Sequence, residues 1–330
     1  VHIVPPMAIE AAYLAREAGT FKASLDIPLF VTGRINQPQE AELILARGQA
    51  DVCGMTRALI CDPRMPSKTE TGHVEDVRAC IACNQACIGH FHKGLPISCI
   101  QHPETGREQQ FGNLARVVQR KRVMVVGGGP AGMKAAAVAA ARGHQVTLYE
   151  ASAQVGGQVL LAQLLPRRSE FGGASTNLQR EMQLAGVEVV RNTRVDLALV
   201  ERERPDAVIV ATGATPYWPA FERGGELQVV DAWQVLRDEV KVGGSVMVVD
   251  WRCDWIGPGI AERLVRAGHQ VHLAVNGTHC GESLPLYVRD QMAGELHTLG
   301  IAMTPYARLY GCDDSSVYLQ HTASGEAMVF

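Results

Sequence analysis

The sequence has 330 residues, 47% of them hydrophobic and 20% charged, and a formal net charge of −3, which is typical of a globular protein of two or three domains. The weak negative charge and an aromatic content of only 5% argue against a surface for binding nucleic acid. No apolar run is long enough for a membrane-spanning helix, and the first residues lack the features of a signal peptide. The nine cysteines therefore indicate a reducing, cytoplasmic setting and ligation of a cofactor rather than disulfides.

The first segment, residues 1–66, contains a predicted strand, helix and second strand. Residues 27–31 and 50–54 are short apolar runs, and residues 38–46 between them show helical periodicity. A helix between two short strands predicts that the strands pair in parallel, as in a βαβ unit.

Each of these predicted strands leads into a glycine and an arginine, Gly33 with Arg34 and Gly54 with Arg57. A glycine lets a phosphate approach backbone N–H groups, and an arginine neutralises its charge. In a (β/α)₈ barrel the phosphate site follows the last two strands. On this pattern alone, a generic βαβ unit with two solvated arginines remains the alternative.

The next segment, residues 67–112, opens with a polar stretch that is expected to be a connector and then carries four cysteines separated by two, three and eleven residues. Three thiolates on one tight loop with a fourth from farther along the chain are typical of a four-iron (4Fe–4S) cluster. Zinc more often takes two Cys-x-x-Cys pairs, and remains the minority alternative. The predicted ligands are Cys80, Cys83, Cys87 and Cys99. The scattered cysteines, interpreted as packing residues, are Cys53, Cys61, Cys253, Cys280 and Cys312.

The third segment, residues 113–220, contains the glycine motif Gly127-Gly-Gly129-Pro-Ala131-Gly132 between a predicted strand and a predicted helix. The first glycine makes the tight turn, the second lets a pyrophosphate approach, and the third lets helix and strand pack closely. Glu150 ends the following strand, where an acid accepts from the ribose hydroxyl and disfavours a 2′-phosphate. This full context predicts a dinucleotide-binding domain, against the alternative of a glycine turn without a ligand.

The last segment, residues 221–330, shows the same strand, turn and helix pattern without the early glycines. Asp250 and bulky residues stand where a pyrophosphate would need close approach. We expect a helix over residues 259–267 and a strand over 270–275, and we expect that NAD(P)H binding is lost. An unusual but functional nucleotide loop remains the alternative.

Several of these motifs together resemble the old yellow enzyme-like iron–sulfur flavoproteins, of the trimethylamine dehydrogenase and 2,4-dienoyl-CoA reductase type. The motifs are Gly-Arg-Ile-Asn-x-Pro ending at Pro38, the stretch from Ala50 to Pro63, and the cysteine spacing. The stretches Asp250–Gly257 and Tyr287–Asp290 resemble the dimethylglycine and N-methylproline demethylase members. The resemblance implies the last units of an FMN-binding barrel in residues 1–66, a cluster segment in 67–112, an FAD- or ADP-binding Rossmann-like domain in 113–220, and a degenerate, incomplete nucleotide-binding-like domain in 221–330.

The resemblance also implies site residues. The expected FMN phosphate contacts are Gly33, Arg34, Gly54, Thr56 and Arg57. The expected residues at the FAD or ADP are Gly127, Gly129, Ala131, Gly132, Glu150, Gln158, Arg168 and Val195, with Arg168 meeting the pyrophosphate. The family's catalytic residues lie on earlier barrel strands that this sequence does not contain, so the chain has the character of a fragment and its catalytic residues remain unknown.

The implied activity is oxidative N-demethylation of a small methylated amine, of the dimethylglycine or N-methylproline type. In the family the amine's hydride equivalent goes to FMN, and electrons leave through the cluster to an acceptor similar to electron-transfer flavoprotein. One alternative is an NAD(P)H-dependent enoate or 2,4-dienoyl-CoA reductase. Another is an electron-transfer subunit without its own substrate site, with a separate chain supplying the barrel. A homo-oligomer is also left open.

Overall fold

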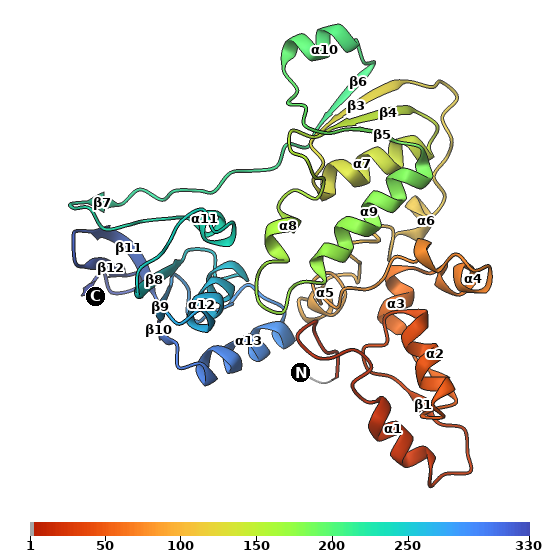
Figure 1. Ribbon diagram of the computed structural model, residues 1–330, viewed down its shortest axis with the longest axis horizontal. Coiled ribbons are helices and arrows are strands. Elements are labelled where there is room, and N and C mark those ends of the chain that lie inside the picture. The colour runs from red at the N-terminus through yellow and green to blue at the C-terminus, as the bar shows by residue number, and fades with distance from the viewer. Residues whose placement is uncertain (1–2) are drawn as a thin grey trace. The chain divides into compact units, whose positions relative to one another are not determined.

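The computed structural model describes residues 3–330, which divide into two compact units. The first unit contains residues 3–163 and Arg168–Ala214, and the second contains Leu164–Arg167 and Thr215–Phe330. Both are α/β structures (Figure 1). The finer division into four segments, ending at residues 66, 112, 220 and 330, stays a prediction. No helix in residues 3–330 is long and apolar enough to cross a membrane.

The first unit starts with the predicted strand, helix and strand. Residues Phe30 and Val31 pair in parallel with Val52 and Cys53, and Ile44 of the intervening helix is buried in the small core beneath them. The strands are shorter than the apolar runs suggested. The elements are α1 (Ala15–Lys22), β1 (Phe30–Val31), α2 (Pro38–Ala46), β2 (Val52–Cys53) and α3 (Thr56–Cys61).

The expected polar connector is helical. Met65 is 4% exposed and packs with Ala58 and Val77, so one buried apolar side chain anchors a helix whose other residues are polar. The sequence analysis expected a connector here and named no helix, because the polar composition does not reveal the buried side chain of Met65. The elements are α4 (Met65–Glu70), the 3₁₀ helix η1 (Val74–Asp76), α5 (Ile88–His92) and α6 (Glu108–Phe111).

A parallel four-stranded sheet in the order β5-β4-β3-β6 forms the rest of the first unit. Side chains alternate along β3, so Val125 meets Met133 and Met182 on one face, while Met124 meets Leu199 on the other. Helices α7 and α9 therefore cover one face and α10 covers the other (Figure 1). The elements are β3 (Arg122–Val126), α7 (Pro130–Ala141), β4 (Gln145–Tyr149), α8 (Val159–Ala162), α9 (Phe171–Ala185), β5 (Glu188–Val190), α10 (Leu197–Glu203) and β6 (Ala207–Val210).

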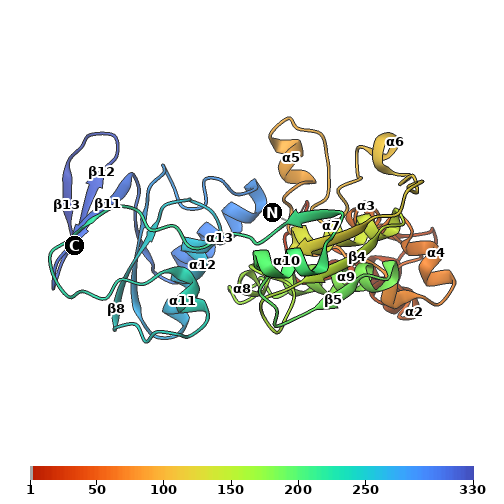
Figure 2. The ribbon, with the colours of Figure 1, turned by 90° about the horizontal axis from the view of Figure 1, so that it is seen from above.

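The second unit repeats a parallel sheet, with three strands in the order β10-β9-β8. A four-stranded sheet in the order β13-β12-β11-β7, not foreseen from the sequence, packs through Leu319 and Ala307 against Ala274 of β9; Figure 2 shows β11, β12 and β13 side by side. The elements are β7 (Glu222–Arg223), α11 (Ala232–Leu236), β8 (Ser245–Asp250), α12 (Ile256–Arg266), β9 (Gln270–Val275), α13 (Leu286–Thr298), β10 (Ala302–Thr304), β11 (Ala307–Cys312), β12 (Val317–His321) and β13 (Ala327–Val329).

Candidate functional site

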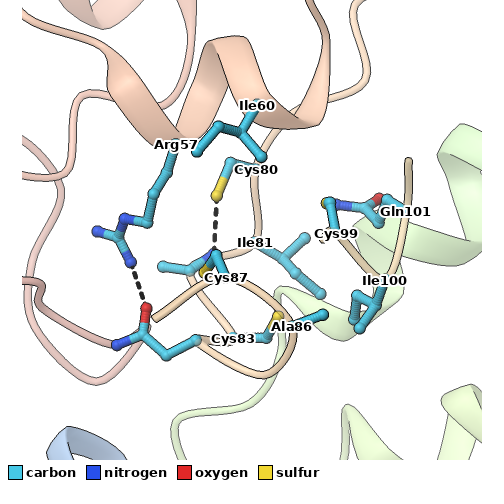
Figure 3. Close-up of a pocket in the computed structure, with 12 residues that line it drawn as sticks. Arg57, Ile60, Cys80, Ile81, Cys83, Ala86, Cys87, Cys99, Ile100 and Gln101 are labelled. Carbon is cyan, nitrogen blue, oxygen red and sulfur yellow. Dashed lines mark hydrogen bonds between the residues drawn. The ribbon is translucent and has the colours of Figure 1, made fainter. Parts of the chain in front are cut away.

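The four predicted cluster cysteines line a single pocket in the first unit (Figure 3). Three of them lie on the loop between η1 and α5, which turns sharply through left-handed backbone at Ala82 and Asn84 (φ 48° and 57°). The fourth arrives after α5, where the N–H of Ser98 donates to the carbonyl of Ala86 at 2.7 Å. Backbone geometry therefore brings together thiols that the sequence separates by eleven residues. They are Cys80, Cys83, Cys87 and Cys99.

The separation of these thiols can be compared with what each of the two metal hypotheses requires. A single zinc ion with sulfurs about 2.3 Å away would hold those sulfurs about 3.8 Å from one another. Among residues 3–330, the one group of three potential ligands with all ligand atoms within 4.8 Å of one another is His73, Glu75 and Asp76, and no three of the cysteines form such a group. A wider set of four thiols fits a multi-atom cluster better than one ion.

The exposed group at His73 has a partner of its own. The Nε of Arg180 donates to Asp76 at 2.6 Å, and its guanidinium also pairs with Glu75. An arginine therefore already neutralises these carboxylates, and we assign this group no metal.

Burial sets the protonation of the pocket thiols. It raises the pKa of Cys80 to about 11 and that of Cys83 above its usual range. The pKa of Cys99 is instead lowered to about 6, and the largest cause is a hydrogen bond with the side chain of Cys61. Ligation of a metal group would release protons from the raised thiols. One N–H donor already points at a pocket sulfur, from Ala82 to Cys80 at 3.4 Å (Figure 3).

Arg57, an expected FMN phosphate contact, faces the cysteine pocket. Its Nη1 donates to Oδ1 of Asn84 at 2.6 Å and to the carbonyl of Pro5 at 2.8 Å. Its charge also opposes the effect of burial on the pKa of Cys80 and Cys87. Asn84 is 1% exposed, and the motif analysis had not singled it out because its role depends on a residue 27 positions away. The contact of Arg57 with FMN stays a prediction.

The other expected FMN contacts lie at the ends of β1 and β2. Because these strands pair in parallel, Gly33 and Gly54 come to the same edge, and a Cβ on Gly54 would lie 2.5 Å from the Thr32 side chain. Arg34 is buried and donates to Glu170 and to the carbonyl of Ile9. Thr56 begins α3 beside this edge. The structure thus gathers the two glycines and pairs Arg34 with a carboxylate.

The glycine turn between β3 and α7 has the close approaches that the motif requires. A Cβ on Gly127, whose φ is 106°, would lie 2.3 Å from the carbonyl oxygen of Ala211, and one on Gly132 would lie 1.9 Å from that of Gly127. A Cβ on Gly129 would meet nothing within 4 Å. The first and third glycines are therefore demanded by the fold, whereas the second faces open space, as a pyrophosphate-binding position would.

Glu150 lies beside this turn at the end of β4. Its carboxylate accepts from the N–H of Gly128 at 2.7 Å and from the N–H of Ser152 at 2.8 Å. Burial favours a higher pKa for Glu150, but these hydrogen bonds hold its pKa below its usual range. An ionised acid next to the glycine turn suits a ribose hydroxyl donor.

The remaining predicted residues of this domain differ in how far their side chains are buried. Ala131 is exposed in the first turn of α7, and Gln158 donates to the carbonyl of Ala214 at 3.3 Å. Val195 packs against the buried side chains of Met124, Tyr149 and Leu199, on the face of the sheet that α10 covers. Arg168 is 7% exposed, and its guanidinium carbon stacks 4.4 Å over the ring of Phe171.

In the second unit, Asp250 fills the corresponding turn. Its Oδ1 accepts from the N–H groups of Arg252 and Cys253 at 3.1 and 3.0 Å, and a Cβ on Gly257 would lie 2.5 Å from its side chain. In a nucleotide loop such N–H groups face the pyrophosphate. Here the protein's own carboxylate accepts from them.

Replacing Asp250 with asparagine is expected to stabilise the fold at neutral pH. Burial raises the pKa of Asp250 to about 6, above its usual value of 3.8, so the stability it contributes is fully present below pH 3.8 and is lost as the pH rises through 6. Asn carries no charge to bury, and the free energy of unfolding at pH 7 should rise by about 1–3 kcal/mol. Urea unfolding at pH 4 and pH 7 measures this, and the gain should shrink at the lower pH.

The matched control is Asp238→Asn, because the Asp238 side chain is 80% exposed. It should change stability little at either pH. An equal effect of Asp250→Asn at both pH values would contradict the explanation by burial.

Residues 121–326 match the family described as pyridine nucleotide-disulphide oxidoreductase. A metal reductase of Desulforamulus reducens is 39% identical over 74% of this chain and 36% of its own length. An N,N-dimethylglycine/sarcosine dehydrogenase of Chromohalobacter salexigens is 33% identical over 88% of this chain and 44% of its own length.

A solved structure of a 2-naphthoyl-CoA reductase complex has a TM-score of 0.88 and 26% identity, covering 98% of this chain and 49% of that one. The chain thus spans less than half the length of the two curated relatives. The resemblance to the old yellow enzyme-like iron–sulfur flavoproteins is confirmed, and the match covers their C-terminal dinucleotide-binding portion. The predicted α/β class with Rossmann-like dinucleotide-binding domains is confirmed as well.

Proposed function

The chain belongs to the pyridine nucleotide-disulphide oxidoreductase family, and we propose from that premise that it is the electron-handling portion of an iron–sulfur flavoprotein oxidoreductase. The observation that carries this proposal is the convergence of four thiols on one pocket in the same compact unit as the glycine turn. In this proposal the pocket holds a 4Fe–4S cluster and the glycine turn holds FAD or ADP.

The side chains of the pocket have defined tasks in this proposal. Cys80, Cys83, Cys87 and Cys99 ligate the cluster, which supplies one-electron transfer when bound. Arg57 places a positive charge near the thiolates and is itself fixed by Asn84 at 2.6 Å. In the neighbouring sheet, the open face of Gly129 admits the pyrophosphate and Glu150 accepts from the ribose.

For the complete protein we propose oxidative N-demethylation of a small methylated amine. Support comes from the similarity to a dimethylglycine/sarcosine dehydrogenase and from the turn at Asp250, whose carboxylate accepts the hydrogen bonds that NAD(P)H would need. FMN at Gly33, Arg34, Gly54, Thr56 and Arg57, and an external acceptor similar to electron-transfer flavoprotein, belong to this proposal. A second candidate, an NAD(P)H-dependent reductase, is supported by the similarity to a 2-naphthoyl-CoA reductase.

Anaerobic flavin reduction in the complete protein separates these candidates. We expect dimethylglycine or N-methylproline to bleach the flavin absorbance, while NADH, NADPH and unmethylated glycine leave it unchanged. Rapid bleaching by NADPH with none by the amines would overturn the demethylase proposal in favour of the reductase. Bleaching by none of these donors would favour an electron-transfer subunit without its own substrate site.

A further inference from the structure

Glu170 connects two parts of the first unit that are far apart in the sequence. It immediately precedes α9 and makes no side-chain capping hydrogen bond with that helix. Its Oε1 instead accepts from Nη2 of Arg34, which lies 136 positions earlier, just after β1. No sequence motif singled out Glu170. A residue of the dinucleotide-binding part of the chain therefore contacts a residue that is expected at the FMN phosphate.

The three guanidinium nitrogens of Arg34 have different surroundings. The side chain is only 5% exposed. Nη1 donates to the carbonyl of Ile9 and Nη2 donates to Glu170, whereas Nε is buried and has no acceptor among residues 3–330. A buried N–H without an acceptor is unfavourable, and an arginine keeps its charge. Nε therefore remains available for an acceptor that these residues do not supply.

A phosphate is an acceptor of the right chemistry for this position. Gly33 immediately precedes Arg34, and Gly54 lies at the same edge because β1 and β2 pair in parallel. Arginine recognises phosphate through the fixed directions of its N–H groups, so its orientation matters as well as its charge. The residues present thus fit the FMN phosphate, and the contacts of Nη1 and Nη2 restrain the guanidinium that would meet it.

We propose that Glu170 is a positioning residue of the FMN site, which holds the guanidinium of Arg34 in the orientation that leaves Nε for the phosphate. This inference rests on the proposed function, since it assumes that FMN binds at the ends of β1 and β2. The FMN site then depends on a residue outside the segment that carries its expected contacts.

Two opposing effects of Glu170 on the phosphate have to be weighed. Its carboxylate orients Arg34, but its negative charge also repels the phosphate. The side chain of Glu170 is 37% exposed, so solvent screens this repulsion. Without Glu170 the long side chain of Arg34 loses a restraint, and FMN binding would have to order it. We therefore expect the orienting effect to be the larger one.

The test compares FMN with riboflavin, which has the same ring system and no phosphate. Both are titrated by fluorescence quenching into the complete protein after removal of FMN, with ADP present to occupy the dinucleotide site. Glu170→Ala should raise the Kd for FMN at least about tenfold, which is about 1.4 kcal/mol, and leave the Kd for riboflavin unchanged. Glu170→Gln keeps an oxygen acceptor without the charge, so it should weaken FMN binding less.

The matched control is Glu201→Ala, which removes an exposed acid of α10 in the same unit and should change neither Kd. Equal weakening of both flavins by Glu170→Ala would indicate a general disturbance of the fold and would overturn the inference. So would FMN binding that is as tight as in the wild type, or tighter. If Glu170→Ala does not fold, the glutamine variant decides: weaker FMN with unchanged riboflavin supports the inference, and any other result contradicts it.

The preference for FMN over riboflavin separates the inference from the proposed function. A wild-type protein that binds FMN no more tightly than riboflavin would overturn both the role of Glu170 and the proposed phosphate site. A wild-type protein that prefers FMN, with the same preference in Glu170→Ala, would overturn only the role of Glu170.

Discussion

Replacing Cys83 with serine is expected to abolish cluster binding while leaving the dinucleotide-binding sheet folded. Cys83 lies on the loop between η1 and α5 and lines the pocket, and iron–sulfur clusters are held by thiolates. Even the loss of a group that only supports a metal ligand costs about 10–100-fold in affinity, so loss of a ligand should exceed this. Iron and acid-labile sulfide per chain, measured after purification without oxygen, provide the readout.

The matched control for Cys83→Ser is Cys312→Ser, since Cys312 is a buried cysteine of β11 in the second unit. It should keep the full iron content. Wild-type iron content in Cys83→Ser, or equal losses in both variants, would contradict the assignment of the ligands.

Two glycine substitutions should affect different properties, one weakening nucleotide binding and the other destabilising the fold. Gly129→Ala places its Cβ where nothing lies within 4 Å, and the backbone there, φ −72° and ψ 175°, suits alanine. Stability should be unchanged, but the methyl group would occupy the approach of the pyrophosphate. FAD or ADP should then bind at least about tenfold more weakly, which is about 1.4 kcal/mol.

Gly132→Ala is the counterpart, because its Cβ would lie 1.9 Å from the carbonyl oxygen of Gly127. Helix α7 would have to move away from the turn, at a cost on the order of 4 kcal/mol or more in the free energy of unfolding. Thermal unfolding by circular dichroism and calorimetric titration with FAD and ADP measure both variants. Unweakened binding by Gly129→Ala would contradict the proposed pyrophosphate position.

Local sequence patterns predicted the helices and strands that are stabilised by residues nearby in the chain. Helix α2 spans residues 38–46 as predicted, because Glu40 accepts from the N–H of Gln37 and closes a capping box at its start. Strand β9 also has its predicted bounds, residues 270–275, since its side chains enter buried cores on both faces. Helix α12 begins three residues before the predicted residue 259, where Oδ1 of Asp254 accepts from the N–H of Ile256 at 2.9 Å.

Local sequence patterns could not predict the contacts that define the candidate site, because these contacts join residues far apart in the chain. Arg34 pairs with Glu170 across 136 positions of the chain, and Arg57 donates to Asn84 across 27 positions. Both depend on how α3 and α9 pack around the cysteine loop. The four ligand candidates were predictable from spacing alone, whereas the residues that orient and polarise them became apparent only in the folded chain.

The central claim is that the pocket of Cys80, Cys83, Cys87 and Cys99 holds an iron–sulfur cluster. The most direct test is the metal and sulfide content of the anaerobically purified protein, with an electron paramagnetic resonance spectrum after reduction by dithionite. We predict about four irons and four acid-labile sulfides per chain, as the [4Fe–4S] composition requires, and a paramagnetic signal on reduction. One zinc per chain, with neither sulfide nor a signal, would contradict the claim.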